Sequence, residues 1–224
     1  LREFFTLFIN MLIRFIVKNI FSFKDETEFN LLPNKSQGLQ HHKVKIGEFE
    51  FLRFSAVYGA NGSGKSNLIK AISILETMIE VGKLPSETDD LKFKLNENNL
   101  QLPISLGIEF ISDNKPFFYS ISFTGDKILY EYLGESKRDE DILIFERNSD
   151  TEFQNIQFHE DYYKTDKEKL FVEILTEKLI QKDELLITFL SKLYPKEFKS
   201  IRTAYEWFDN TLVIIKPDDK PEGI

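Results

Sequence analysis

Residues 59–66 constrain this chain more than any other segment, because they match the pattern G-x-x-x-x-G-K-[ST] at every fixed position. The apolar run at residues 54–58 precedes them and is predicted to be a short buried strand. Apolar residues at helical spacing follow, so a helix is predicted to about Val81, where Gly82 ends it. A strand, a glycine-rich turn and a helix N-terminus together form an anion site. The sequence therefore predicts a loop that binds a nucleoside triphosphate with magnesium.

The residues of this loop have distinct predicted tasks. Its glycines allow backbone conformations that residues with a Cβ avoid, so successive amides can point at one phosphate. Lys65 would reach the β- and γ-phosphates, and the Ser66 hydroxyl would ligate magnesium. The predicted nucleotide-binding residues are Gly59, Ala60, Asn61, Gly62, Ser63, Gly64, Lys65, Ser66 and Asn67.

Composition excludes several other classes of protein. The chain has 224 residues and a formal net charge of −8, which argues against a wholly basic nucleic-acid binder but leaves room for a local basic patch. It has no Cys, which excludes disulfides, thiol catalysis and Cys-based zinc sites. This composition is compatible with a reducing cytoplasm, and we expect a cytoplasmic protein.

The first residues are very apolar, but their pattern indicates neither a signal peptide nor a membrane span. Arg14 and Lys18 interrupt the apolar run, no small-residue cleavage site follows, and the uninterrupted part is too short to cross a bilayer. Residues 1–10 are interpreted as an upstream extension, with Met11 as a natural start. The alternative is a genuine short helix that packs on the core.

The pattern along the rest of the chain predicts an α/β fold of the P-loop NTPase type. Strands are expected at residues 11–18, 26–31 and 43–54, and an antiparallel meander at residues 103–147, with a further strand at 152–158. Helical periodicity begins near Thr165 and predicts three helices up to Trp207, which with Phe208 would anchor them to the sheet. The expected segments are 1–10 (upstream extension), 11–82 (P-loop core lobe), 83–160 (antiparallel β-subdomain), 161–210 (helical segment) and 211–224 (strand and polar tail). One face of the first helix is expected to present Leu170, Phe171, Ile174, Leu175, Leu179 and Ile180.

Several segments resemble a known family. Asn19 with Phe21-Ser22-Phe23, followed by G-A-N-G-S-G-K-S-N, resembles the ATPase heads of the ABC type found in SMC and RecF proteins. Residues 117–121, 128–133, 143–147 and 205–208 are similar to the AAA15 family of bacterial ATP-binding proteins, and the resemblance covers roughly residues 11–216.

That resemblance implies an ABC-like fold in which a P-loop core carries an antiparallel β-subdomain and a helical insertion. It implies ATP and magnesium as cofactors, a homodimer formed through the nucleotide, and a role in phage defence beside an effector nuclease, with nucleic acid as a further partner. It gives no reason to expect a membrane. By the same resemblance, Asn19, Phe21, Ser22 and Phe23 would lie near the adenine or ribose.

A working head of this type also needs a strand that ends in Asp-Glu and a Ser-x-Gly signature. Neither is found in convincing form, so no catalytic residue is evident and little hydrolysis is expected from this chain alone. Residues 142–146, Ser36-Gln37-Gly38 and residues 212–215 are imperfect matches, interpreted as a sheet strand, a surface turn and a structural strand.

Two questions about function stay open at the level of sequence. The missing elements are expected after Ile224 or on a partner, so the chain is interpreted as an N-terminal portion. The alternative is a regulatory or structural module that binds nucleotide without hydrolysis and acts through a partner subunit; a small-molecule kinase is disfavoured. Gln101 and Gln154 are candidates for a glutamine that senses magnesium.

Overall fold

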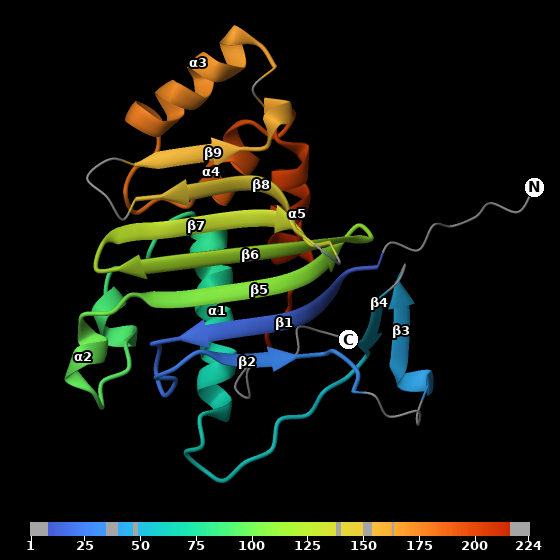
Figure 1. The fold of residues 1–224 in the computed structure, drawn as a ribbon. Helices are drawn as coiled ribbons and strands as arrows, with labels where there is room; N and C mark the ends of the chain where they lie inside the picture. The colour runs from blue at the N-terminus through green and yellow to red at the C-terminus, as the bar shows by residue number, and fades with distance from the viewer. Residues whose placement is uncertain are drawn as a thin grey trace, which may run out of the picture.

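The computed structural model describes residues 9–34, 40–46, 49–137, 140–149, 154–162 and 164–215. Within these ranges the fold is a seven-stranded antiparallel sheet in the order β2-β1-β5-β6-β7-β8-β9, with helices packed on one face (Figure 1). The strands are β1 (Met11–Lys18), β2 (Thr27–Asn30), β5 (Ile104–Ser112), β6 (Lys115–Thr124), β7 (Lys127–Glu135), β8 (Ile142–Asn148) and β9 (Asn155–Phe158). Because β1 pairs with β5, the predicted core lobe and the predicted β-subdomain share one sheet.

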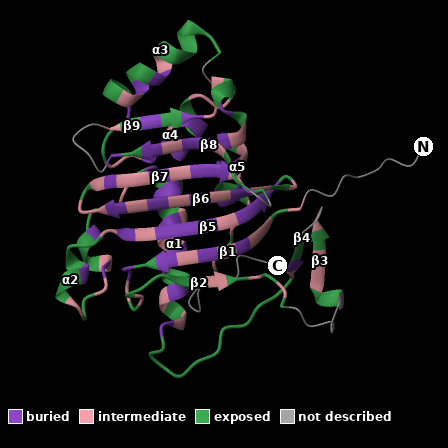
Figure 2. Cartoon of the chain, in the orientation of Figure 1, coloured by how far each residue is buried: buried purple, intermediate pink, exposed green. Residues whose placement is uncertain are grey.

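The predicted meander is present, and its turns follow from local chemistry. Asp113 and Asn114, between β5 and β6, both have positive φ, as a two-residue hairpin turn requires. Gly125 supplies positive φ between β6 and β7. Along β6, buried and half-buried residues alternate, so one side of the strand faces the helices. Figure 2 shows this alternation of buried and partly exposed positions across the sheet.

The helices include α1 (Lys65–Val81), α4 (Leu186–Leu193) and α5 (Lys199–Asn210), which contribute to one hydrophobic core with the sheet. The prediction that Gly82 ends the helix after the loop is confirmed, since Gly82 has φ 85 and caps α1. The other elements are the hairpin β3 (Lys43–Ile46) with β4 (Phe49–Leu52), the short helices η1 (Gln40–His42), η2 (Thr88–Leu91), α2 (Glu97–Leu100) and η3 (Glu160–Tyr162), then α3 (Asp166–Ile174) and the π-helical turn η4 (Leu175–Leu179).

Aromatic packing joins α5 to the sheet, as the sequence predicts. The Trp207 ring stacks on Phe110 of β5 with centroids 4.4 Å apart, and Phe208 meets the same ring edge-on at 5.2 Å. Trp207 is 2% exposed and Phe110 is fully buried. Aromatic pairs of this kind add to the area that they bury, so this cluster is a main attachment of the helical layer.

Two predicted strands are absent. Residues 54–58 and residues 212–215 have no regular secondary structure, and Tyr58 and Ile215 are 89% and 81% exposed. Both segments have the apolar character of strands. A strand also needs a neighbour that pairs with its backbone, and no described strand pairs with either segment.

The apolar face predicted for the first helix of the helical segment is only partly buried. Leu170 and Ile174 are 55% and 38% exposed, whereas Leu175 and Ile180 are buried. The turn η4 has π geometry, which rotates the residues after Ile174 relative to an α-helical face. A single α-helical period therefore identified only part of the buried face correctly.

Some predictions fall outside the described residues. Most of the predicted extension (residues 1–8), the turn Ser36-Gln37-Gly38 and the tail at residues 216–224 belong to this group. In the described part of the chain, no helix combines the length and the apolar character that crossing a membrane requires.

Replacement of Trp207 tests the role of this cluster. Trp207→Ala should lower the free energy of unfolding by about 3–5 kcal/mol, because it removes a large buried ring. Trp207→Phe is the matched control: it keeps a ring and removes an indole N–H that has no hydrogen-bond partner within the described ranges, so it should cost less. Urea unfolding followed by circular dichroism measures both. Equal losses for the two variants would contradict the stacking account.

Candidate functional site

The predicted phosphate loop lies directly before α1, and its glycines have the backbone conformations that the motif requires. Gly62 has φ 79 and Gly64 has φ 93, a region that side chains with a Cβ rarely adopt. Gly64 is the N-cap residue of α1, so Lys65 and Ser66 form the first turn of the helix. The first amides of a helix have no partner within the helix and carry its positive dipole end. The loop therefore presents N–H groups at one helix N-terminus.

The Lys65 side chain is folded over the loop. Its Nζ donates to the carbonyl oxygens of Gly59 and Ala60, each at 2.8 Å. These bonds place a positive charge beside the loop amides. An anion that contacted those amides would also be within reach of the ammonium group, so the loop has the two features that phosphate binding needs.

The turn at residues 19–23 packs against the loop, although about forty residues separate them in the sequence. Asn67 Nδ2 donates to Ser22 Oγ at 3.1 Å. A Cβ placed on Gly64 would lie 2.7 Å from Ser22 Oγ and 3.9 Å from the Phe23 ring, so this contact also requires glycine at residue 64. The structure thus brings together two segments that only a family resemblance linked in the sequence.

Asn19 and Phe21 hold this turn in place from its other side. Both have positive φ, at 55 and 52. Asn19 is fully buried, and its Nδ2 donates to the carbonyl oxygens of Asn99 and Leu102 at 2.8 and 2.9 Å. The Phe21 amide donates to the Leu91 carbonyl at 2.7 Å. The Asn19 side chain therefore has a structural role, and its predicted proximity to the base stays a prediction.

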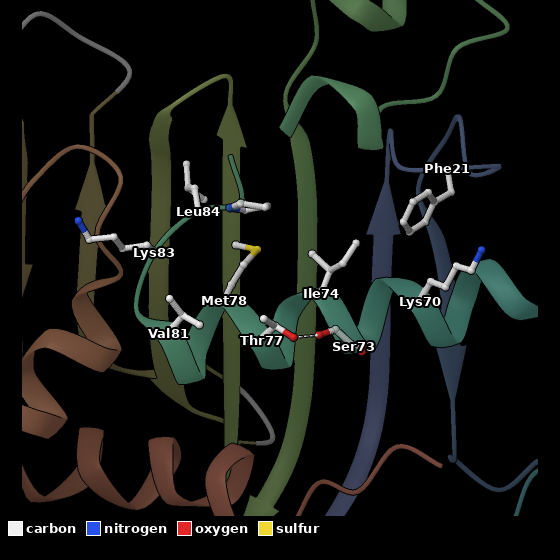
Figure 3. A pocket seen from close by; sticks show the side chains of 10 residues that line it. Phe21, Lys70, Ser73, Ile74, Thr77, Met78, Val81, Lys83 and Leu84 are labelled. Carbon is white, nitrogen blue, oxygen red and sulfur yellow. Dashed lines mark hydrogen bonds between the residues drawn. The ribbon is translucent and has the colours of Figure 1, made fainter. Parts of the chain in front are cut away.

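A groove of about 370 Å³ runs along one side of α1, and Figure 3 shows the side chains that line it. We call it the α1 groove. One end of the groove is formed by the residues that follow α1. The other end is lined by Phe21, which belongs to the turn that contacts the phosphate loop. The lining residues are Phe21, Lys70, Ser73, Ile74, Thr77, Met78, Val81, Lys83, Leu84 and Pro85.

The C-terminal end of α1 is fixed by α4. Thr188 Oγ1 donates to the Ile79 carbonyl at 2.6 Å, and Lys192 Nζ donates to the Glu80 carbonyl at 2.6 Å. These groups pair carbonyls that the end of a helix leaves without partners, and the lysine charge favours the negative end of the dipole. The helix that begins at the phosphate loop is therefore held at both ends.

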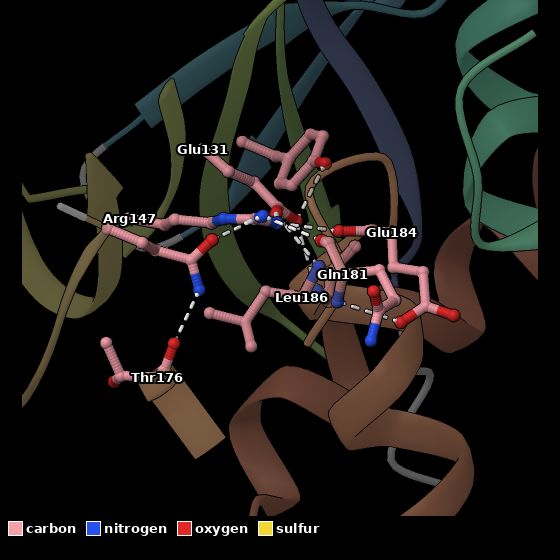
Figure 4. A network of polar contacts seen from close by, with 9 residues as sticks. Glu131, Arg147, Thr176, Gln181, Glu184 and Leu186 are labelled. Carbon is pink, nitrogen blue, oxygen red and sulfur yellow. Dashed lines mark hydrogen bonds and ion pairs between the residues drawn. The ribbon is translucent and has the colours of Figure 1, made fainter. Parts of the chain in front are cut away.

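A buried ion pair in turn fixes α4 to the sheet (Figure 4). The fully buried Glu131 carboxylate of β7 accepts hydrogen bonds from the amides of Leu186 and Ile187 at 2.8 and 3.0 Å, and so caps the N-terminus of α4. Arg147 of β8 lies 3.8 Å from this carboxylate and donates to the Glu184 carbonyl at 2.6 Å. Burial raises the pKa of Glu131, while the charge of Arg147 and the two amides oppose that rise.

This pair was not predicted from the sequence, although a signal for it exists. Glu131 and Arg147 are direct partners in the register of β7 and β8, and each interrupts a strand rich in apolar residues. Opposite charges at paired positions of a predicted hairpin indicate a cross-strand ion pair.

The remaining candidates lie in structural positions. Gln154 accepts from Arg147 Nη2 at 2.8 Å and donates to the Thr176 carbonyl at 3.1 Å, so its amide belongs to the ion-pair network. Gln101 is exposed at the end of α2. Glu146 accepts from the Tyr130 hydroxyl at 2.8 Å within the sheet, as expected for a sheet strand. A magnesium-sensing role for either glutamine stays a prediction.

A glycine-rich loop at the N-terminus of a helix, on a mixed α/β scaffold, defines a domain of the P-loop ATPase type. Comparison with known families agrees: residues 54–207 match the family described as AAA domain, putative AbiEii toxin, Type IV TA system. The match spans more than half of the chain, and the chain belongs to this family. No curated protein matches the sequence.

Replacement of Glu131 tests the anchor of α4. Glu131→Gln should lower the free energy of unfolding by about 3–5 kcal/mol, because it leaves the Arg147 charge buried without a carboxylate. Adding Arg147→Met should recover part of this loss, since the double variant buries no unpaired charge. Urea unfolding of the two single variants and the double variant measures the coupling. Strictly additive losses would contradict the proposed pairing.

Proposed function

We propose that this chain binds ATP with magnesium through residues 59–67. The observation that carries the proposal is the position of the Lys65 ammonium, which lies over the glycine-rich loop at the N-terminus of α1. A lysine charge, helix amides and left-handed glycines at one point suit a triphosphate better than a smaller or neutral ligand. Membership in an AAA family supports the same assignment.

The residues present fit the phosphate groups and the metal. A Cβ on Gly59 would lie 2.5 Å from Ser63 Oγ, so the closed loop leaves little room for a side chain at this residue. The amides of residues 60–66 would surround the β-phosphate, and Lys65 would neutralise the β- and γ-phosphates. Ser66 is exposed in the first turn of α1, where its hydroxyl would ligate magnesium. When bound, the ion supplies positive charge to the phosphate oxygens.

At a finer level, we propose an ATPase head of the ABC type, of the kind found in AAA15 proteins, that dimerises through its nucleotide. A defence role is favoured by the family description, which names a toxin of a Type IV TA system. An effector nuclease, nucleic acid and a cytoplasmic location belong to the same proposal. The contact of Ser22 with Asn67 supports it, because the motif behind the resemblance then forms part of the site.

The second candidate is a nucleotide-binding module that does not hydrolyse ATP and acts through a partner. One observation favours it: none of the strands in the described ranges ends in Asp-Glu. In addition, residues 54–58, which lead into the loop, are exposed and unpaired within the described part of the chain. For the ATPase head, the groups that orient a water molecule would have to come from outside the residues described, whereas the second candidate needs none.

Replacement of Lys65 tests nucleotide binding. Lys65→Ala should weaken binding of ATP with magnesium at least about tenfold, or 1.4 kcal/mol, because it removes the cation next to the loop. Lys70→Ala is the matched control, since it removes an equal charge from the same helix outside the loop and should leave the affinity nearly unchanged. Isothermal titration calorimetry measures both. An unchanged affinity for Lys65→Ala would overturn the proposal.

Turnover tests whether the site is complete within this chain. The purified chain with ATP and magnesium should release phosphate far more slowly than about 1 per second, the lower end of ordinary enzyme rates, because no group that orients water is evident. A phosphate-release assay measures this, with Lys65→Ala as the background. Turnover near 1 per second that disappears in Lys65→Ala would show that the site is complete within this chain.

A further inference from the structure

We propose that the α1 groove binds a small anionic amphiphile, an aliphatic chain that carries a carboxylate or phosphate head. Nothing in the family description assigns a ligand to this surface. The proposal rests on the lining of the groove and on its charge, and it does not depend on nucleotide binding at the loop.

The body of the groove is apolar. Its apolar lining consists of Ile74, Met78 and Val81 of α1, with Phe21 toward one end and Leu84 toward the other (Figure 3). The Thr77 hydroxyl adds little polarity, since it donates to the carbonyl oxygen of Ser73 within the helix. Such a surface favours a hydrocarbon chain, and methionine adapts to ligands of different shape.

The charged residues of the lining are both lysines, one at each end. Lys83 lies within 3.9 Å of the Asp183 and Glu184 carboxylates, which partly neutralise it. Lys70 has no hydrogen-bond or ion-pair partner among the described residues, so its charge is available to a ligand. The dipole of α1 also disfavours an anion at the Val81 end. We therefore place the anionic head at Lys70 and the chain toward Met78 and Leu84.

The dimensions suit a small molecule. From Lys70 to Val81 the helix rises about 16 Å, at 1.5 Å per residue. The volume of about 370 Å³ lies near the lower end of the range typical of small-molecule sites, roughly 300–1,000 Å³. A medium-length chain such as that of decanoate matches a groove of this length and volume.

The methionines offer a direct readout, because the chain has two of them. Met78 lines the groove, whereas Met11 lies in β1 and packs on a separate small cluster. In protein labelled with ¹³C at the methionine methyl groups, titration with decanoate should shift the Met78 resonance saturably and leave Met11 in place. Met11→Leu assigns the two signals. Decyltrimethylammonium, which has the same chain and the opposite charge, should bind at least about tenfold more weakly.

Variants separate the head from the chain and from the phosphate loop. Lys70→Gln should weaken decanoate binding several-fold, while Lys178→Gln, which removes an exposed lysine of η4, should not. Lys65→Ala should bind decanoate with the same affinity as the wild type. Loss of nucleotide binding at the loop can therefore be distinguished from loss of decanoate binding at the groove. A parallel titration with decyl phosphate identifies the preferred head by its tighter binding.

Three outcomes would overturn the proposal: no shift of Met78 with decanoate or decyl phosphate, equal shifts of Met78 and Met11, or equal binding of the cationic probe. Because Lys70 is exposed, Lys70→Gln should fold normally, and an unchanged unfolding midpoint establishes this.

Discussion

The phosphate loop depends on a helix that is fixed at both ends. At its start, Ser22 fills the space beside Gly64 and accepts a hydrogen bond from Asn67. At its end, Thr188 and Lys192 of α4 pair with carbonyls that the helix would otherwise leave unsatisfied. Because both ends of α1 are held, the N–H groups of its first turn have a fixed orientation. Preoriented N–H groups bind an anion without first having to reorganise.

The Glu131–Arg147 pair extends this support into the sheet. Burial of two charges is costly, and a pair of this kind is tolerated only when further hydrogen bonds satisfy its atoms. Here the carboxylate accepts the first amides of α4 and the guanidinium donates to the Glu184 carbonyl just before that helix. The pair therefore joins β7, β8 and α4. It connects the sheet, through α4, to the helix that carries Lys65.

The sequence predicted the locally determined parts of the fold. β1 has the predicted bounds and α1 ends at the predicted residue, because alternation, helical periodicity and a terminal glycine are local signals. Residues 54–58 were mispredicted because a strand exists only with a paired neighbour, and pairing is not local. The contact of Ser22 with the loop was not predicted, since about forty residues lie between them and the family resemblance only placed residues 19–23 near the adenine or ribose. The Glu131–Arg147 pair was not predicted, although opposite charges at paired positions of the predicted hairpin would have indicated it.

Family membership and local geometry support the same function. The family gives an AAA domain over residues 54–207, and the geometry gives a lysine and helix amides at one glycine-rich loop. The most direct test of this account is a ¹⁵N amide spectrum recorded with and without ATP and magnesium. The account predicts that the largest shifts occur at Gly62, Gly64 and Lys65. Saturable shifts elsewhere, with these amides unmoved, would contradict it.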